Sequence, residues 1–270
     1  MGGRHYPQAD TAHVNVPVHL FRVWEKVVPS LARPGQLALF ADFDGTLAPI
    51  CSHPSDARML AGTRPLLAAC AKRVALTGVV SGRRLLDVRR RVGVSGAWYA
   101  GVHGYALASP RNRSFLLLNR VERERIAYVA SRLSQALSGL NGIRVEYKEA
   151  AVAVHYRGAS IDSQHTAGRL VRSLSAESPD LRLMSGRKVW EFLPAGKVNK
   201  ASAIRFILGL KRSRPTLVFL GDDVTDEAVF QQMGGIMVLV GKRRHTAARY
   251  WLRSPGEVRQ FLKRCLRLWN

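Results

Sequence analysis

Apolar residues in this chain form two kinds of pattern, short continuous runs and repeats with the period of a helix. Largely apolar runs occur at 37–41, 74–80 and 216–220, and each is followed by Asp, Ser or Gly. Runs of this length are typical of strands buried on both faces of a parallel sheet. Helical repeats lie between them, for example at 85–92 and 120–137. This alternation predicts an α/β fold with a parallel sheet.

The middle of the chain follows a different pattern. Residues 143–147 and 151–156 alternate between polar and apolar side chains, which predicts an antiparallel hairpin. A helical repeat at 162–174 follows, and then two further strand-like segments at 181–184 and 188–192. Hairpin alternation sets this block apart from the parallel runs on either side of it.

Together the patterns predict a Rossmann-like parallel-sheet core with an inserted α/β lid, or cap, domain. We assign residues 1–107 and 193–270 to the core and residues 108–192 to the cap. Near the start of the chain, residues 19–31 have an amphipathic repeat that predicts one helix, which Pro34-Gly35 would end.

The composition is that of a globular protein. The chain has 270 residues, of which 47% are hydrophobic, enough for a sizeable core. No apolar stretch approaches the roughly 18 residues of a membrane-spanning helix, and the N-terminus lacks a signal-peptide pattern. The three cysteines form no close pair, so neither a zinc site nor a disulfide framework is expected. We expect a cytoplasmic protein without a membrane partner.

The formal net charge of +23 is unusually high, and most of the basic residues are arginines. One interpretation is a nucleic-acid partner, because 242–244 and 249–251 combine cations with aromatic side chains. The arginines are nevertheless spread along the whole chain, with no block of five like charges. This distribution favours a basic surface that steers anionic substrates over one that binds nucleic acid.

Two carboxylates at the end of the first apolar run are the strongest chemical signal. Asp42 and Asp44 lie two residues apart and are followed by Gly45-Thr46. Ligands bind at the carboxyl ends of parallel strands, and paired acids suit a divalent cation and acid–base chemistry. An Asx turn at the strand end is the alternative. The apolar run before the motif and Gly-Thr after it favour the chemical site.

Three further polar groups follow in a fixed order along the chain. Ser81 ends the second run, Lys200 opens a late helical repeat, and Gly221-Asp222-Asp223-Val224-Thr225-Asp226-Glu227 follows the third run. Each has a simpler interpretation: Ser81 and the acidic loop could cap the next helix, and Lys200 could be solvated surface. The ordered set resembles the haloacid dehalogenase-like phosphohydrolases.

That resemblance implies hydrolysis of a phosphate monoester through an aspartyl-phosphate. Asp42 would be the nucleophile, and Asp44 the general acid and then the base. Mg²⁺ would be held by Asp42, Asp222 and the backbone carbonyl of Asp44. Asp223 and Asp226 would lie in or near the shell around these ligands. Ser81 and Lys200 would contact the phosphoryl group.

More specific motifs narrow the resemblance to the trehalose-6-phosphate phosphatases. His103 lies in a Gly-x-His-Gly turn, where it is either structural or a substrate contact. Other shared motifs are Val145-Glu146-Tyr147-Lys148, His155-Tyr156-Arg157 and Glu191-Phe192-Leu193-Pro194. The resemblance runs from about residue 37 to 241. It departs at Asn199-Lys200-Ala201, where the family usually has Asp-Lys-Gly, and Asn can still cap the helix.

The resemblance implies Mg²⁺-dependent conversion of trehalose 6-phosphate to trehalose. Glu146, Lys148 and Glu191 would bind glucose hydroxyls, because carboxylates accept and ammonium groups donate hydrogen bonds. Arg83 and Arg157 would meet the substrate, with Arg187 or Lys188 adding to this set. Another sugar phosphatase, acting for example on sucrose phosphate, is one alternative. A basic nucleic-acid-binding protein that keeps the fold is the other.

Overall fold

The computed structural model describes residues 16–186, 188–196, 198–241 and 245–270. The chain divides into two compact units. Unit 1 contains residues 1–76 and 213–270, and unit 2 contains residues 77–212. In the described part of the chain, no helix combines the length and the apolar character needed to cross a membrane.

Unit 1 contains five strands that all pair in parallel, in the order β1-β13-β12-β11-β2. Every residue of β2 and β12 is buried, as the continuous apolar runs require. The carboxyl ends of β2 and β11 are neighbours because the two strands pair in register. The strands are β1 (Val18–His19), β2 (Leu37–Ala41), β11 (Thr216–Gly221), β12 (Ile236–Val240) and β13 (Tyr250–Leu252).

Helices complete unit 1, and one of them differs from its prediction. The helix expected over 19–31 is wrong at its start, because Val18 and His19 pair with β13 as strand β1. A 3₁₀ turn follows, and the α-helix begins at Trp24, whose ring packs edge-on against Phe261, 6.1 Å between centroids. The α-helices are α1 (Trp24–Leu31), α2 (Thr63–Ala71), α7 (Glu227–Gln232) and α8 (Pro255–Leu268). The 3₁₀ turns are η1 (Leu20–Val23), η2 (Pro34–Gln36), η3 (Pro54–Asp56) and η5 (Val224–Asp226).

Unit 2 begins with strands in the order β3-β4-β5-β6. β3 and β4 pair in parallel through the crossover helix α3, whereas β5 and β6 add antiparallel. Helix α6 packs against this sheet through Phe206, which meets Phe115 edge-on at 5.5 Å. The elements are β3 (Leu76–Val80), α3 (Leu85–Val92), β4 (Trp98–Gly101), η4 (Val102–Gly104), β5 (Ala106–Ala108), β6 (Ser114–Leu116) and α6 (Lys200–Gly209).

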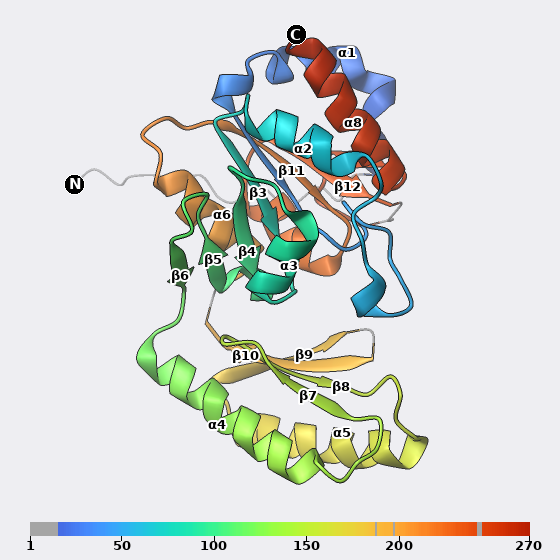
Figure 1. Cartoon of the computed structure of the whole chain (residues 1–270), viewed down its shortest axis with the longest axis vertical. Helices are drawn as coiled ribbons and strands as arrows, with labels where there is room; N and C mark the ends of the chain where they lie inside the picture. The colour runs from blue at the N-terminus through green and yellow to red at the C-terminus, as the bar shows by residue number, and fades with distance from the viewer. Residues whose placement is uncertain (1–15, 187, 197, 242–244) are drawn as a thin grey trace, which may run out of the picture. The chain divides into compact units, whose positions relative to one another are not determined.

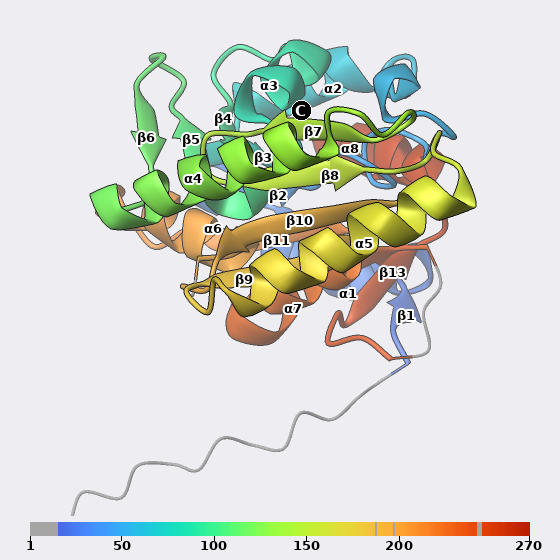
Figure 2. The ribbon, with the colours of Figure 1, turned by 90° about the horizontal axis from the view of Figure 1, so that it is seen from below.

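A second sheet in unit 2 has four antiparallel strands in the order β7-β8-β10-β9. Figures 1 and 2 show helices α4 and α5 side by side along one face of this sheet. Ile126, Leu133, Val154, Val171 and Phe192 are at most 1% exposed in the core between them. The elements are α4 (Arg120–Leu137), β7 (Arg144–Tyr147), β8 (Val152–His155), α5 (Ile161–Ala176), β9 (Leu181–Gly186) and β10 (Val189–Pro194).

The other face of the four-stranded sheet carries polar side chains. Val154 and Phe192 belong to the helix-covered core, so strand alternation turns Ala153, His155 and Glu191 to the opposite face. Glu146 and Glu191 lie on the same rung, on either side of Ala153. The two acids are thus separated by one small residue, Ala153. The structure confirms the predicted α/β fold, the parallel strands and the antiparallel hairpin.

Candidate functional site

The loop after β2 is held in one tight conformation by its backbone. Asp42 is 4% exposed, and its N–H donates to the carbonyl of Leu220 on β11 (2.8 Å). The carbonyl of Phe43 accepts from the N–H groups of Leu47 (3.0 Å) and Ala48 (2.9 Å). Asp44 is half-buried and forms a bridge with Ala48. Both carboxylates therefore start from a backbone with little freedom to move.

Gly45 lets this loop approach the end of β11. Its φ is +81°, the left-handed region that glycine adopts at least cost. A side chain there would collide with the carboxylate of Asp222. Thr46 adds a hydrogen bond from its hydroxyl to Oδ1 of Asp222 (3.4 Å). Gly45 and Thr46 therefore form the turn and also hold the carboxylate of Asp222 in place.

Asp226 organises the acidic loop after β11. Its side chain is fully buried, and Oδ2 accepts from the N–H groups of Asp222 (2.9 Å) and Asp223 (3.0 Å). Asp223 in turn caps the 3₁₀ turn η5 by accepting from the N–H of Val224 (2.6 Å). Asp223 is therefore a helix cap, as the simpler interpretation of this motif expected. Asp226 instead fixes the backbone of the loop from a buried position.

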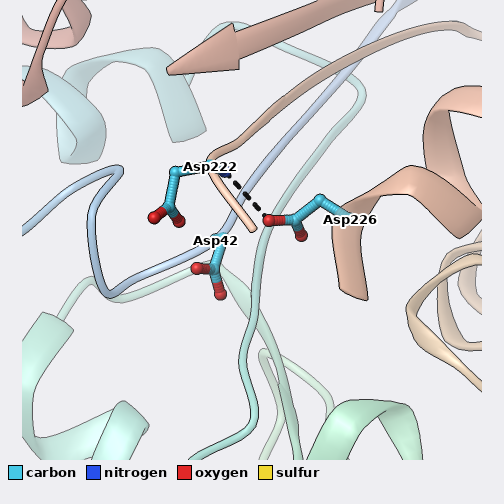
Figure 3. A group of neighbouring side chains, drawn as sticks. All are labelled: Asp42, Asp222 and Asp226. Carbon is cyan, nitrogen blue, oxygen red and sulfur yellow. Dashed lines mark hydrogen bonds between the residues drawn. The ribbon is translucent and has the colours of Figure 1, made fainter. Parts of the chain in front are cut away.

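Three carboxylates converge where β2 and β11 end, and we call Asp42, Asp222 and Asp226 the acid cluster. One oxygen from each lies within 4.8 Å of the others. Figure 3 shows the three side chains next to one another, with the hydrogen bond from the Asp222 backbone to the Asp226 carboxylate dashed. Carboxylate oxygens at this spacing suit Mg²⁺, which takes one or two carboxylates and keeps room for water or phosphate. Because Asp226 is engaged by two N–H groups, Asp42 and Asp222 are the better candidates for direct ligands.

In unit 2, Ser81 directly follows β3 and is 1% exposed. Its N–H donates to the carbonyl of Ala100 (2.8 Å), and its hydroxyl accepts from the N–H of Arg83 (3.2 Å). The residue at the N-cap of α3 is Arg84. Ser81 therefore does not cap this helix, which removes the simplest structural interpretation of the residue.

Arg83 is held by an acid of the following helix. Its Nη1 donates to Oδ2 of Asp87 (2.9 Å), which also binds Nε of Arg91 (3.0 Å). Partial burial raises the pKa of Asp87, but the hydrogen bonds and charges of Arg91 and Arg83 outweigh it, so the pKa is lowered. Asp87 was not recognised from the sequence, although its position four residues after Arg83 is the spacing of a helical ion pair.

His103 lies in a strained turn after β4. Val102 and His103 both have positive φ, +50° and +56°, which β-branched valine in particular rarely adopts. The ring of His103 packs over Gly82, where a Cβ would lie 2.6 Å from Cε1. Its Nδ1 is buried and has no hydrogen-bond partner in the described part of the chain. Backbone strain of this kind is concentrated at functional sites.

Glu191 joins the turn to the four-stranded sheet. Its Oε2 accepts from Nε2 of His103 (3.0 Å), and its Oε1 accepts from Nζ of Lys148 (2.8 Å). Burial raises the pKa of Glu191, but the His103 hydrogen bond and the Lys148 charge outweigh this and lower the pKa to about 2. The carboxylate is therefore ionised and fixed on both oxygens.

Glu146 has a partner of its own on the neighbouring strand. Nε2 of His155 donates to its Oε2 (2.8 Å), and both side chains are about four-fifths buried. This hydrogen bond lowers the pKa of Glu146 against the opposing effect of burial, and the Lys148 charge lowers it further. We call His103, Glu146, Lys148, His155 and Glu191 the paired cluster.

Lys200 opens helix α6, as the sequence predicts, and is 2% exposed. Asn199 caps the helix by accepting from the N–H of Ser202 (3.0 Å), which confirms that Asn replaces the expected Asp as a cap. A buried ammonium group is costly unless negative charge compensates it. Lys200 is therefore not the solvated surface residue of the simpler interpretation.

The remaining predicted contacts are less defined. Arg157 and Lys188 are exposed, and Nζ of Lys188 lies 5.5 Å from the ring centroid of Tyr156. Arg187 and the basic segment 242–244 lie outside the described residues. Of the predicted residues, unit 1 brings together Asp42, Asp222 and Asp226, and unit 2 brings together His103, Lys148 and Glu191.

Comparison with known proteins gives a consistent result. The family model described as trehalose-phosphatase matches residues 40–253. The chain belongs to the trehalose-phosphatase family. The match spans both the acid cluster and the paired cluster, and it confirms the resemblance found from the motifs.

Individual relatives agree with this family. The trehalose-phosphate phosphatase of Mycobacterium avium is 38% identical over an alignment of 245 residues, and the match covers 84% of this chain and 61% of that protein. The chain thus spans about six-tenths of the length of this relative. A solved trehalose-6-phosphate phosphatase related protein superposes with a TM-score of 0.71 at 25% identity, covering 86% of this chain and 97% of the other. The C-terminal domain of the Candida albicans trehalose-6-phosphate phosphatase has the same fold, with a TM-score of 0.73 at 21% identity, covering 95% and 100%.

Proposed function

We propose that the protein hydrolyses trehalose 6-phosphate to trehalose and phosphate. The acid cluster at the ends of β2 and β11 carries this proposal, because three carboxylates within 4.8 Å suit a divalent cation and a phosphate ester. Membership of the trehalose-phosphatase family supports the choice of substrate. The names of the relatives support it further.

In the proposed reaction a carboxylate oxygen of Asp42 attacks phosphorus, and the bond from phosphorus to the sugar oxygen breaks. Asp44 gives its proton to that oxygen, and trehalose leaves. Asp44 then takes a proton from water, whose oxygen attacks phosphorus and releases phosphate from Asp42. The backbone hydrogen bonds of the 42–48 loop support these roles, because they hold the main chain that carries both side chains at one strand end.

Mg²⁺ is the proposed cofactor, held by Asp42, Asp222 and the carbonyl of Asp44. When bound, it would compensate the negative charges of the carboxylates and the phosphate. Asp223 and Asp226 support the loop that presents Asp222. Ser81 would donate a hydrogen bond to the phosphoryl group, and the buried Lys200 would contribute positive charge.

The paired cluster is proposed to recognise the sugar. Glu146, Lys148 and Glu191 offer acceptors and a donor on one face of a sheet, and sugar hydroxyls need both. His103 would contact the substrate beside Glu191. Arg83 would grip phosphate, and Asp87 supports this by holding its guanidinium group. We assign exposed Arg157 and Lys188, and Arg187, to outer contacts with the substrate.

The predicted division into a core (1–107 and 193–270) and a cap (108–192) remains a proposal. The separate four-stranded sheet with helices α4 and α5 supports it. A cytoplasmic location is also a proposal, supported by the free thiols of Cys51, Cys70 and Cys265.

A substrate panel tests the proposed function. Phosphate release is measured from trehalose 6-phosphate, glucose 6-phosphate, sucrose 6-phosphate and p-nitrophenyl phosphate, with Mg²⁺ and with EDTA. We expect a strong preference for trehalose 6-phosphate that EDTA abolishes. Broad Mg²⁺-dependent hydrolysis would support another sugar phosphatase, and no hydrolysis of any ester would contradict the phosphatase chemistry.

A further inference from the structure

The carboxylate of Glu146 is held on one side only. His155 donates to Oε2 (2.8 Å), whereas no hydrogen bond within the described residues engages Oε1. Arg144 contributes a weaker contact, with its Nη2 3.8 Å from Oε2, through a side chain that is 66% exposed. Lys148, two residues further along the chain and just after β7, directs its ammonium group to Glu191 instead. His155 is therefore the group that fixes the orientation of Glu146.

Register explains why His155 can take this role. Glu146 lies opposite Ala153, and His155 lies two residues further along β8, opposite Arg144. Alternation keeps Ala153 and His155 on one face, and the methyl group of alanine leaves room for the imidazole to reach across. The contact is thus a diagonal cross-strand pair in which His155 is anchored by a strand whose Val152 and Val154 are fully buried.

We propose that His155 is a positioning residue that directs the Oε1 atom of Glu146 toward a sugar hydroxyl and thereby contributes to selectivity for trehalose 6-phosphate. This inference rests on the proposed function. His155 itself does not touch the reacting atoms. Its removal leaves Glu146 free to rotate or to turn toward Lys148, so the sugar loses an oriented acceptor while the acid cluster is untouched.

Steady-state kinetics of His155→Ala and His155→Gln test the proposal, with trehalose 6-phosphate and p-nitrophenyl phosphate as substrates. We expect His155→Ala to raise KM for trehalose 6-phosphate about tenfold, the equivalent of one charged hydrogen bond. Turnover of p-nitrophenyl phosphate should stay within about twofold. His155→Gln should restore most of the KM, because its amide can donate to the same oxygen. Exposed His165 of α5 provides the control His165→Ala, which should change neither substrate.

Equal losses on both substrates, or a Gln variant as impaired as the Ala variant, would overturn the proposal and assign His155 a structural role. A double variant with Glu146→Ala gives a further check. Its KM should equal that of Glu146→Ala alone, because the histidine acts through the carboxylate. Additive effects would overturn the proposal even if the single Ala variant folds poorly.

A readout independent of activity separates this inference from the proposed function. The groups that face Glu146 are Arg144 of β7, Lys148 just after β7, His155 of β8 and Glu191 of β10. NMR titration of the Glu146 carboxyl should show a higher pKa in His155→Ala than in the wild type. A wild type that does not hydrolyse trehalose 6-phosphate contradicts the proposed function. An unchanged Glu146 titration contradicts the positioning role.

Discussion

The acid cluster and the paired cluster solve opposite electrostatic problems. The acid cluster gathers three carboxylates of like charge within 4.8 Å, one of them fixed by backbone N–H groups. In the paired cluster each carboxylate meets an imidazole, and Glu191 also meets an ammonium group. A site of like charges suits a cation and an anionic ester, whereas a compensated site suits neutral hydroxyl groups. This contrast agrees with the proposed function, in which the strand ends carry the chemistry and the sheet face selects the sugar.

The sharpest test of this division is Asp42→Asn. We expect a loss of more than about a thousandfold in kcat on both trehalose 6-phosphate and p-nitrophenyl phosphate, because an amide cannot form the covalent intermediate. The Tm should not fall, since one of three like charges is removed. Exposed Asp56→Asn provides the control. Near-normal turnover of either ester would refute Asp42 as the nucleophile.

Gly45→Ala tests whether the acid cluster depends on close backbone approach. Gly96 is a matched control, because its φ of +83° resembles the +81° of Gly45 but nothing lies within 4 Å of a Cβ there. Both variants should lose about 1 kcal/mol from the positive φ. Only Gly45→Ala should displace Asp222 and lower kcat at least about tenfold on both substrates. The same loss of activity in both variants would remove the special role of Gly45.

Lys148→Met tests the paired cluster through substrate selectivity. Loss of a charged hydrogen bond should raise KM for trehalose 6-phosphate by roughly ten- to a hundredfold. Hydrolysis of p-nitrophenyl phosphate should change little, because that ester offers no sugar hydroxyls. Exposed Lys26→Met of α1 is the control. A parallel loss on both esters would mean that Lys148 is structural.

The dependence of stability on acidic pH gives the smallest expected effect. It tests whether the ion pairs of Glu191 with His103 and Lys148 stabilise the fold. The folded pKa of Glu191 is about 2, below its ordinary value of 4.5. Its ionised form therefore stabilises the fold fully above pH 4.5, and this contribution is lost as the pH falls toward 2. Urea unfolding of Glu191→Gln should show a weaker decline in the free energy of unfolding over this range than the wild type. Exposed Glu25→Gln of α1 is the control, and its free energy of unfolding should decline with pH as in the wild type. If Glu191→Gln also declines as the wild type does, the ion pair does not contribute to stability.

Much of the fold could be predicted from periodicity. The helix expected over 120–137 has those bounds in α4, and the predicted hairpin is present as β7 and β8. The start of α1 could not be predicted, because His19 is drawn into a strand by β13, more than 200 residues away. Local patterns carry no information about such distant pairing.

The candidate site was likewise predicted only in part. Strand ends and motif spacing indicated which acids, hydroxyl and lysine to expect. Side-chain partners depend on strand register, so no motif indicated that Lys148 pairs with Glu191 rather than with nearby Glu146, or that His155 pairs with Glu146. The left-handed turn at Val102 and His103 was also hidden, because a β-branched valine rarely adopts a positive φ.

The order of the chain has a consequence for synthesis. β2 pairs with β11, yet every residue of unit 2 lies between them. At roughly 5–20 residues per second, translation separates these strands by on the order of ten seconds or more. Unit 2 is therefore fully synthesised while one edge of β2 still lacks its partner. Asp42 can meet Asp222 only after residue 222 has been synthesised, so a ribosome that stalls before residue 216 leaves an apolar strand open to aggregation and no acid cluster.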